Sequence, residues 1–177
     1  MASGDTLVIF PATSGVPGDA DYATLDTILT ASTDEPDNVI PVLDFDPGAT
    51  NEFAYFTAVM PSTYAGTTGI TVTLVWSASA TATTGNCIWN VAFKSVTDDA
   101  DDLDSKVFAA PNAVTDATAS VNGEVVYSNI TFTDGADMDS VAAGEVFWME
   151  VSRDAANASD TLTGDDAELH MIIVKET

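Results

Sequence analysis

Two stretches of alternating apolar and polar residues decide the fold: Ile70-Thr-Val-Thr-Leu-Val-Trp76 and Cys87-Ile-Trp-Asn-Val-Ala-Phe93. Successive side chains of a β-strand point to opposite faces, so each stretch presents every second residue to a core. Trp76 belongs to the buried face of the first stretch and Trp89 to that of the second. Small residues separate the two stretches, which favours a hairpin that pairs them directly.

The same period of two continues outward from these stretches. Within residues 51–60, Phe53, Tyr55 and Thr57 point one way, and Phe56 and Met60 point the other way. Eight to ten strands are expected, with turn signals every 8–12 residues and no amphipathic helix longer than two turns. The sequence therefore predicts an all-β protein, a jelly-roll-like antiparallel β-sandwich with an extended N-terminal arm. Further strands are expected near residues 39–45, 124–133, 145–151 and 167–175, and Asn122-Gly123 signals a hairpin.

The first 36 residues differ from the rest of the chain. They contain one short apolar run, Leu7-Val-Ile-Phe10, followed by prolines and glycines that interrupt regular structure. We expect residues 1–36 to form an extended arm that contributes little to the core. Residues 37–177 are expected to form the sandwich domain.

Some predicted strands are apolar on both faces, although a sandwich strand needs only one buried face. Between residues 145 and 151, Trp148 alternates with Phe147 and Met149, and residues 169–174 are almost continuously apolar. The second face predicts either a subunit interface, which leads us to expect a homotrimer, or a surface that the N-terminal arm covers.

Charge excludes two classes of partner. The chain has 28 acidic residues against four Lys and Arg, a net charge of -24. Nucleic acid and anionic membranes need basic residues to neutralise their phosphates, so neither is an expected partner. No segment approaches the roughly 18 apolar residues of a membrane span. Such charge also keeps copies apart in solution and is common in proteins adapted to saline water.

No catalytic pattern emerges from the sequence. His170 is the only histidine and Cys87 the only cysteine, and both lie in predicted strands rather than beside a nucleophile or a base. A glycosidase needs two carboxylates at a set separation, which Glu52, Glu145 or Glu150 could meet by chance among so many acids. We therefore predict a non-enzymatic protein with no cofactor.

Acidic turns offer oxygen ligands for a hard cation, Ca²⁺ or Mg²⁺. None of them has the spacing of an EF-hand loop. Two turns are the best candidates for metal ligands, and their acidic residues are Asp98, Asp99, Asp101, Asp102, Asp104, Asp134, Asp137 and Asp139. For each turn taken separately, solvated carboxylates are the better explanation.

Three segments together resemble a family: Val42 to Pro61, Gly69 to Trp89 and Asp139 to Leu169. They are similar in strand and turn texture to the small acidic β-sandwich virion structural proteins of tailed bacteriophages from aquatic and other environmental sources. The resemblance covers roughly residues 40–175 and includes no catalytic motif, so it implies no site residue.

The resemblance implies a virion protein that binds the major capsid protein or another virion protein. Because packaged DNA would repel so acidic a chain, we expect it on the outer surface of the head, as a capsid decoration or cement protein. One alternative is a receptor- or glycan-binding module of a phage fibre, in which Tyr64, Tyr127 or Trp148 could stack on sugars. Another is a surface-layer or filament subunit assembled by strand donation.

Overall fold

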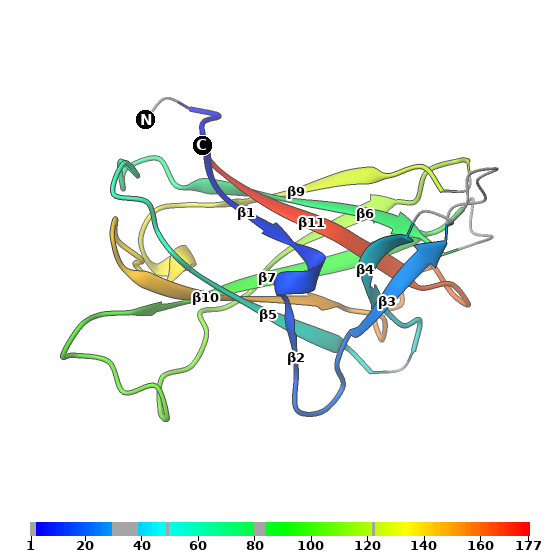
Figure 1. The fold of residues 1–177 in the computed structure, drawn as a ribbon, viewed down its shortest axis with the longest axis horizontal. Helices are drawn as coiled ribbons and strands as arrows, with labels where there is room; N and C mark the ends of the chain where they lie inside the picture. Colours follow the sequence, from blue (N-terminus) through cyan, green and yellow to red (C-terminus); the bar gives the residue numbers. More distant parts are fainter. Residues whose placement is uncertain (1–2, 30–38, 49, 80–83, 122) are drawn as a thin grey trace.

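In the computed structural model, residues 3–29, 39–48, 50–79, 84–121 and 123–177 are described. They form two antiparallel sheets packed face to face, which confirms the predicted jelly-roll-like sandwich (Figure 1). The six-stranded sheet contains β1 (Thr6–Pro11), β3 (Thr24–Leu29), β4 (Val39–Phe45), β6 (Ile70–Ala78), β9 (Val126–Phe132) and β11 (Ala167–Glu176). The five-stranded sheet contains β2 (Val16–Pro17), β5 (Glu52–Val59), β7 (Asn86–Val96), β8 (Asn112–Ala117) and β10 (Val146–Arg153).

The strand order is β3-β4-β11-β6-β9 in the first sheet, where β1 also pairs with β11, and β2-β5-β10-β7-β8 in the second. Among the described residues, the connections between strands contain the 3-10 helices η1 (Ala12–Ser14) and η2 (Ala136–Met138). None of the helical turns in the described part of the chain has the length and hydropathy that crossing a lipid bilayer requires.

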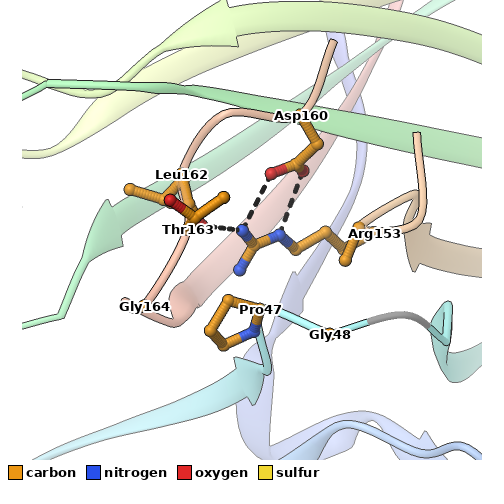
Figure 2. A pocket seen from close by; sticks show the side chains of 8 residues that line it. Pro47, Gly48, Arg153, Asp160, Leu162, Thr163 and Gly164 are labelled. Carbon is orange, nitrogen blue, oxygen red and sulfur yellow. Dashed lines mark hydrogen bonds and ion pairs between the residues drawn. The ribbon is translucent and has the colours of Figure 1, made fainter. Parts of the chain in front are cut away.

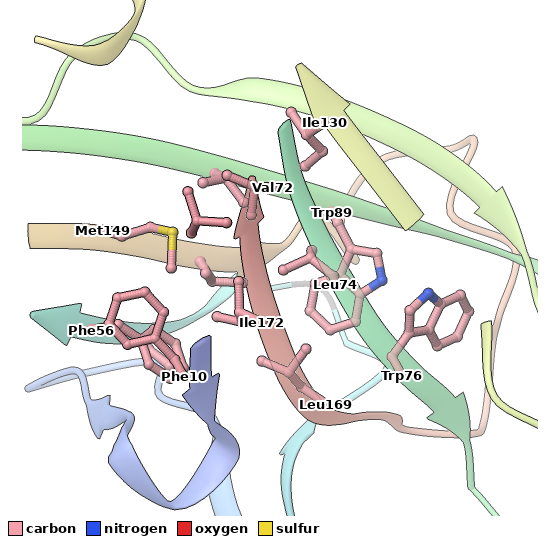
Figure 3. Packing of buried hydrophobic residues seen from close by; sticks show 14 of the residues in the cluster. Phe10, Phe56, Val72, Leu74, Trp76, Trp89, Ile130, Met149, Leu169 and Ile172 are labelled. Atoms are coloured by element: carbon pink, nitrogen blue, oxygen red, sulfur yellow. The ribbon is translucent and has the colours of Figure 1, made fainter. Parts of the chain in front are cut away.

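The predicted hairpin between the two deciding stretches is wrong. They form β6 and β7, which lie in opposite sheets, and Trp76 and Trp89 meet edge to face across the core at 5.9 Å between ring centroids. Strands that bury their apolar faces against each other must face one another rather than lie side by side. Around these rings the two sheets share one core, which Figure 3 shows from close by.

The predicted hairpin at Asn122-Gly123 is wrong for a similar reason. β8 and β9, which flank it, belong to different sheets, and Asn122 itself lies outside the described residues. The two strands are nevertheless neighbours at the edge of the sandwich, where the Ser128 hydroxyl donates to Asp116 at 2.9 Å. The turn therefore connects two layers instead of two strands of one sheet.

The N-terminal segment is part of the sandwich and not an arm apart from it. β1 pairs with β11, β2 with β5 and β3 with β4, so residues 6–29 add strands to both sheets. Phe10 and Ala23 are buried in the common core. Prolines and glycines do interrupt this segment, but the short runs between them still pair with sheet edges and fill core positions. The predicted boundary at residue 36 therefore does not separate two structural units among the described residues.

Candidate functional site

The outer face of the five-stranded sheet carries aromatic side chains on two neighbouring strands. Tyr55 on β5 lies directly opposite Glu150 on β10, and the rows on either side contain Phe53 and Trp148. All four side chains are partly exposed, while the alternate residues of both strands are directed into the core. The alternation predicted for Phe53, Tyr55 and Thr57 is thus confirmed, and the second apolar face of β10 is this outer surface.

A residue from the loop between β7 and β8 completes this cluster. The Phe108 ring lies 5.8 Å from the Tyr55 ring, centroid to centroid. The ammonium of Lys94, on β7, stands 4.9 Å from the Phe108 centroid and 5.8 Å from the Trp148 ring. We call the surface formed by Phe53, Tyr55, Phe108 and Trp148 the aromatic face.

Polar groups accompany these rings. Burial raises the pKa of Glu150, against the opposing effects of a hydrogen bond with the Tyr55 hydroxyl and the charge of Lys94. Burial and the neighbouring Glu150 likewise raise the pKa of Tyr55, so its hydroxyl keeps its proton at neutral pH. The aromatic face therefore offers flat apolar rings beside a carboxylate, a phenol and an ammonium group.

Such a combination suits a ligand that has both apolar and hydrogen-bonding surfaces. Aromatic rings with polar neighbours are enriched where one side of a contact is apolar and the other wet. Large apolar side chains that lie together and remain partly open to solvent, with polar groups around them, are typical of interaction sites.

The other aromatic candidates from the sequence lie elsewhere. Tyr64 is buried, and its hydroxyl donates to Asp134 at 3.0 Å, so it cannot stack on a ligand. Tyr127 is 58% exposed, but it lies on β9 in the opposite sheet. Of the three, Trp148 alone belongs to the aromatic face. Phe108 and Lys94 were missed, since neither carries a signal in the sequence that would link it to β5 and β10.

The two predicted acidic turns come together around a lysine. The Lys106 ammonium lies 2.9 Å from the Asp101 carboxylate and 3.1 Å from that of Asp139. The backbone N–H of Thr97 and the same ammonium lower the pKa of Asp101. A protein cation thus occupies the position between the turns.

The remaining predicted ligands are dispersed. Asp137 accepts hydrogen bonds from the backbone and hydroxyl of Thr133, and the Thr133 N–H is the main cause that lowers its pKa. In the described part of the chain, no three His, Cys, Asp or Glu side chains converge as metal ligands would. Asp98, Asp99, Asp102, Asp104 and Asp134 are exposed in their loops. Binding of Ca²⁺ or Mg²⁺ at these turns stays a prediction.

A cavity of about 200 Å³ lies over Arg153 and is lined by Pro47, Gly48 and Gly164 among others (Figure 2). Arg153 makes five hydrogen bonds, two of them to the Asp160 carboxylate at 3.1 and 2.9 Å. The other three go to backbone carbonyl groups of Phe45, Leu162 and Asp165. A guanidinium group has five N–H donors, so none is left for a ligand. Arg153 ties loops together and is no anion site.

His170 and Cys87 also have structural surroundings. The His170 ring lies 2.9 Å from the Ser77 hydroxyl, and burial lowers the pKa of the imidazole. Cys87 is buried in the core, where desolvation raises the pKa of its thiol. Neither residue is among those that line the cavity over Arg153.

Carboxylates gather on the outer face of the six-stranded sheet. Asp44 on β4 lies opposite Glu168 on β11, and Asp26 on β3 is close by. Burial is the main cause that raises the pKa of Asp44 to about 7, and the charges of Glu168, Asp26 and Asp166 add to it.

This arrangement makes stability depend on pH. The pKa of an aspartate in an unfolded chain is about 3.9, so between roughly pH 4 and pH 7 the folded protein binds the extra proton. Stability contributed by Asp44 is therefore lost as the pH rises through this window. We expect Asp44→Asn to stabilise the protein by about 1 to 2 kcal/mol at pH 8, after allowance for solvent screening, and to have little effect at pH 4.5. Urea unfolding at both pH values measures the difference.

The control for this prediction is Glu124→Gln, which removes one negative charge from an exposed position. It tests whether a lower net charge alone stabilises the chain. Equal gains from Asp44→Asn and Glu124→Gln at pH 8, or a gain from Asp44→Asn that does not change with pH, would contradict the prediction.

Comparison with known proteins bears on the fold. No family model matches the sequence, and no curated protein is similar to it. A family 35 carbohydrate-binding module from Clostridium thermocellum has a TM-score of 0.51 at 10% identity, over 96% of this chain and 98% of the module. The CBM22-1 xylan-binding domain from Paenibacillus barcinonensis Xyn10C has a TM-score of 0.49 at 5% identity, over 99% of this chain and 96% of that domain. The first similarity establishes a shared jelly-roll sandwich over nearly the whole of both chains.

Proposed function

We propose that this chain is a non-catalytic glycan-binding module that binds a neutral sugar chain on the aromatic face. The observation that carries the proposal is the convergence of Tyr55, Phe108 and Trp148, from two strands and a loop, on one partly exposed surface. The proposal rests on these side chains, because the likeness to carbohydrate-binding modules concerns the fold.

Sugar rings match this surface chemically. Their C–H groups form apolar patches that pack on aromatic rings, and their hydroxyl groups need hydrogen-bond partners at the rim. Glu150 and the Tyr55 hydroxyl can exchange hydrogen bonds with such hydroxyls, and Lys94 can donate to them. A sheet surface holds these groups in fixed register, which limits the entropy lost on binding.

Charge favours a neutral ligand over an acidic one. At a net charge of -24, the protein repels anionic polysaccharides at low ionic strength. Within the aromatic face, the positive charge of Lys94 is partly compensated by the neighbouring Glu150. Little positive charge is therefore left to attract an anionic ligand. An uncharged glycan is not repelled by the net charge and does not need a free cation on the aromatic face.

The test compares a tryptophan on the five-stranded sheet with a tyrosine on the six-stranded sheet. Trp148→Ala is expected to weaken binding to the best ligand in a panel of neutral polysaccharides by about tenfold or more. Tyr127→Ala, which truncates an exposed ring on the other sheet, is the matched control and should bind as the wild type does. Isothermal titration calorimetry measures affinity, and circular dichroism checks that both variants fold. Loss of binding in Tyr127→Ala with retention in Trp148→Ala would place the site on the six-stranded sheet and contradict the proposal. A wild-type protein that binds no polysaccharide of the panel would refute it.

The virion setting stays a separate prediction. A glycan-binding module fits a fibre of a phage more directly than a decoration protein on the head, since fibres contact host surfaces. Location on the outer head, binding to the major capsid protein and a homotrimeric state remain predictions, as does the surface-layer alternative. Copy number in purified particles separates them: near that of the capsid protein for decoration, and a few per particle for a fibre.

A further inference from the structure

The loop between β7 and β8, residues 97–111, extends from the sandwich on the side of the five-stranded sheet (Figure 1). It begins with a turn in which the N–H groups of Ala100 and Asp101 donate to the Thr97 carbonyl. A second turn follows, closed by the N–H of Lys106 on the Asp102 carbonyl. At its far end the loop returns to β7, where the Ala109 N–H donates to the Phe93 carbonyl at 2.9 Å.

Lys106 fastens the middle of this loop to the sandwich. Its ammonium reaches Asp101 within the loop, Asp139 after η2 and the Ser95 hydroxyl on β7, the last at 2.9 Å. Asp139 is itself held, because its carboxylate accepts the Ser95 backbone N–H at 2.9 Å. One lysine side chain thus connects three separate segments, and we call this set of contacts the Lys106 clip.

Phe108 lies two residues beyond the clip and one residue before the Ala109 hydrogen bond. It is therefore held from both sides along the chain. Its ring contacts Tyr55, and the Lys94 ammonium stands over it. Its neighbour Val107 is 78% exposed and therefore does little to hold this part of the loop. The position of Phe108 on the aromatic face depends on how the loop is anchored.

We propose that Lys106 is a positioning residue, which holds the β7–β8 loop so that Phe108 forms one wall of the glycan-binding face. This inference rests on the proposed function. Lys106 does not touch the ligand in this arrangement. It acts through the loop, by keeping the Phe108 ring in place before the ligand arrives, and such preorganisation lowers the entropic cost of binding.

Breaking the clip should weaken binding while the sandwich stays folded. Lys106→Met removes the ammonium and keeps the aliphatic length, and we expect binding about five- to tenfold weaker. Lys106→Arg retains a cation in reach of both carboxylates and should restore most of the affinity. Lys175→Met removes the same charge from β11 in the opposite sheet and serves as the control, with affinity expected to equal that of the wild type.

A second measurement follows the loop without any ligand. Hydrogen exchange of the Ala109 amide should accelerate at least about tenfold in Lys106→Met, and core amides of β6 and β11 should exchange as before. Unchanged exchange at Ala109 would overturn the inference, because the clip would then not hold the loop. Faster exchange with unchanged affinity would also overturn it, since the loop would not shape the site. If the wild type binds no glycan, the proposed function fails and this role of Lys106 fails with it, whereas wild-type binding that Lys106→Met retains in full refutes only the role of Lys106.

Discussion

Replacement of Arg153 by methionine should lower the free energy of unfolding by about 3 to 5 kcal/mol. The side chains of Arg153 and Asp160 are 1% and 2% exposed, and the substitution leaves the Asp160 carboxylate buried without its counter-charge. Backbone carbonyl groups of Leu162 and Phe45 lose their donor at the same time. Chemical denaturation monitored by tryptophan fluorescence measures the change.

Two further variants isolate the effect of burial. Lys106→Met breaks two ion pairs, with Asp101 and Asp139, whose side chains are 19 to 27% exposed. Because solvent screens such pairs, each contributes about 1 kcal/mol or less, and the loss should be smaller than in Arg153→Met. The double variant Arg153→Met with Asp160→Asn removes both charges and should be more stable than Arg153→Met alone, because no unpaired charge then remains in the interior. A loss below about 1 kcal/mol in Arg153→Met would show that water reaches Asp160 and that the pair is not buried in solution.

Strands were predictable from the sequence because the alternation of apolar and polar residues within one short stretch indicates which of its side chains are buried. The stretch from Ile70 to Trp76 forms most of β6, with every second residue in the core as expected. Its partners were not predictable in the same way. β6 pairs with β9 and with β11, roughly sixty and one hundred residues later in the chain, and no local turn signal specifies pairing over such distances.

The candidate site was predictable only in part. Trp148 stood out because β10 is apolar on both faces, and the alternation in β5 placed Tyr55 and Phe53 together. Phe108 lies in an acidic loop without periodicity, so only the structure shows that its ring reaches Tyr55. The pairing of Arg153 was hidden for a different reason, since any of 28 acids could have been its partner.

Replacement of Phe10 by alanine should destabilise the protein by about 3 to 5 kcal/mol. Phe10 is 5% exposed, and its ring lies 5.6 Å from that of Phe56 and 6.3 Å from that of Phe147, both in the opposite sheet. Truncation would leave a cavity between the sheets that the surrounding rings can fill only partly. Thermal and chemical denaturation measure the loss.

Ile9→Ala provides the matched control, because Ile9 is the preceding residue of the same strand and is 53% exposed on the outer surface. It should cost roughly 1 kcal/mol or less, since little apolar area is removed from burial. Equal, small losses at both positions would mean that β1 is detached from the sandwich in solution, as an N-terminal arm would be. A large loss confined to Phe10→Ala would mean that folding of the sandwich requires the N-terminal segment, since β1 places that ring between the two sheets and pairs along β11. Any role of this segment in attachment to a partner would then have to be met by its exposed side chains, while its strands remain in the sheets.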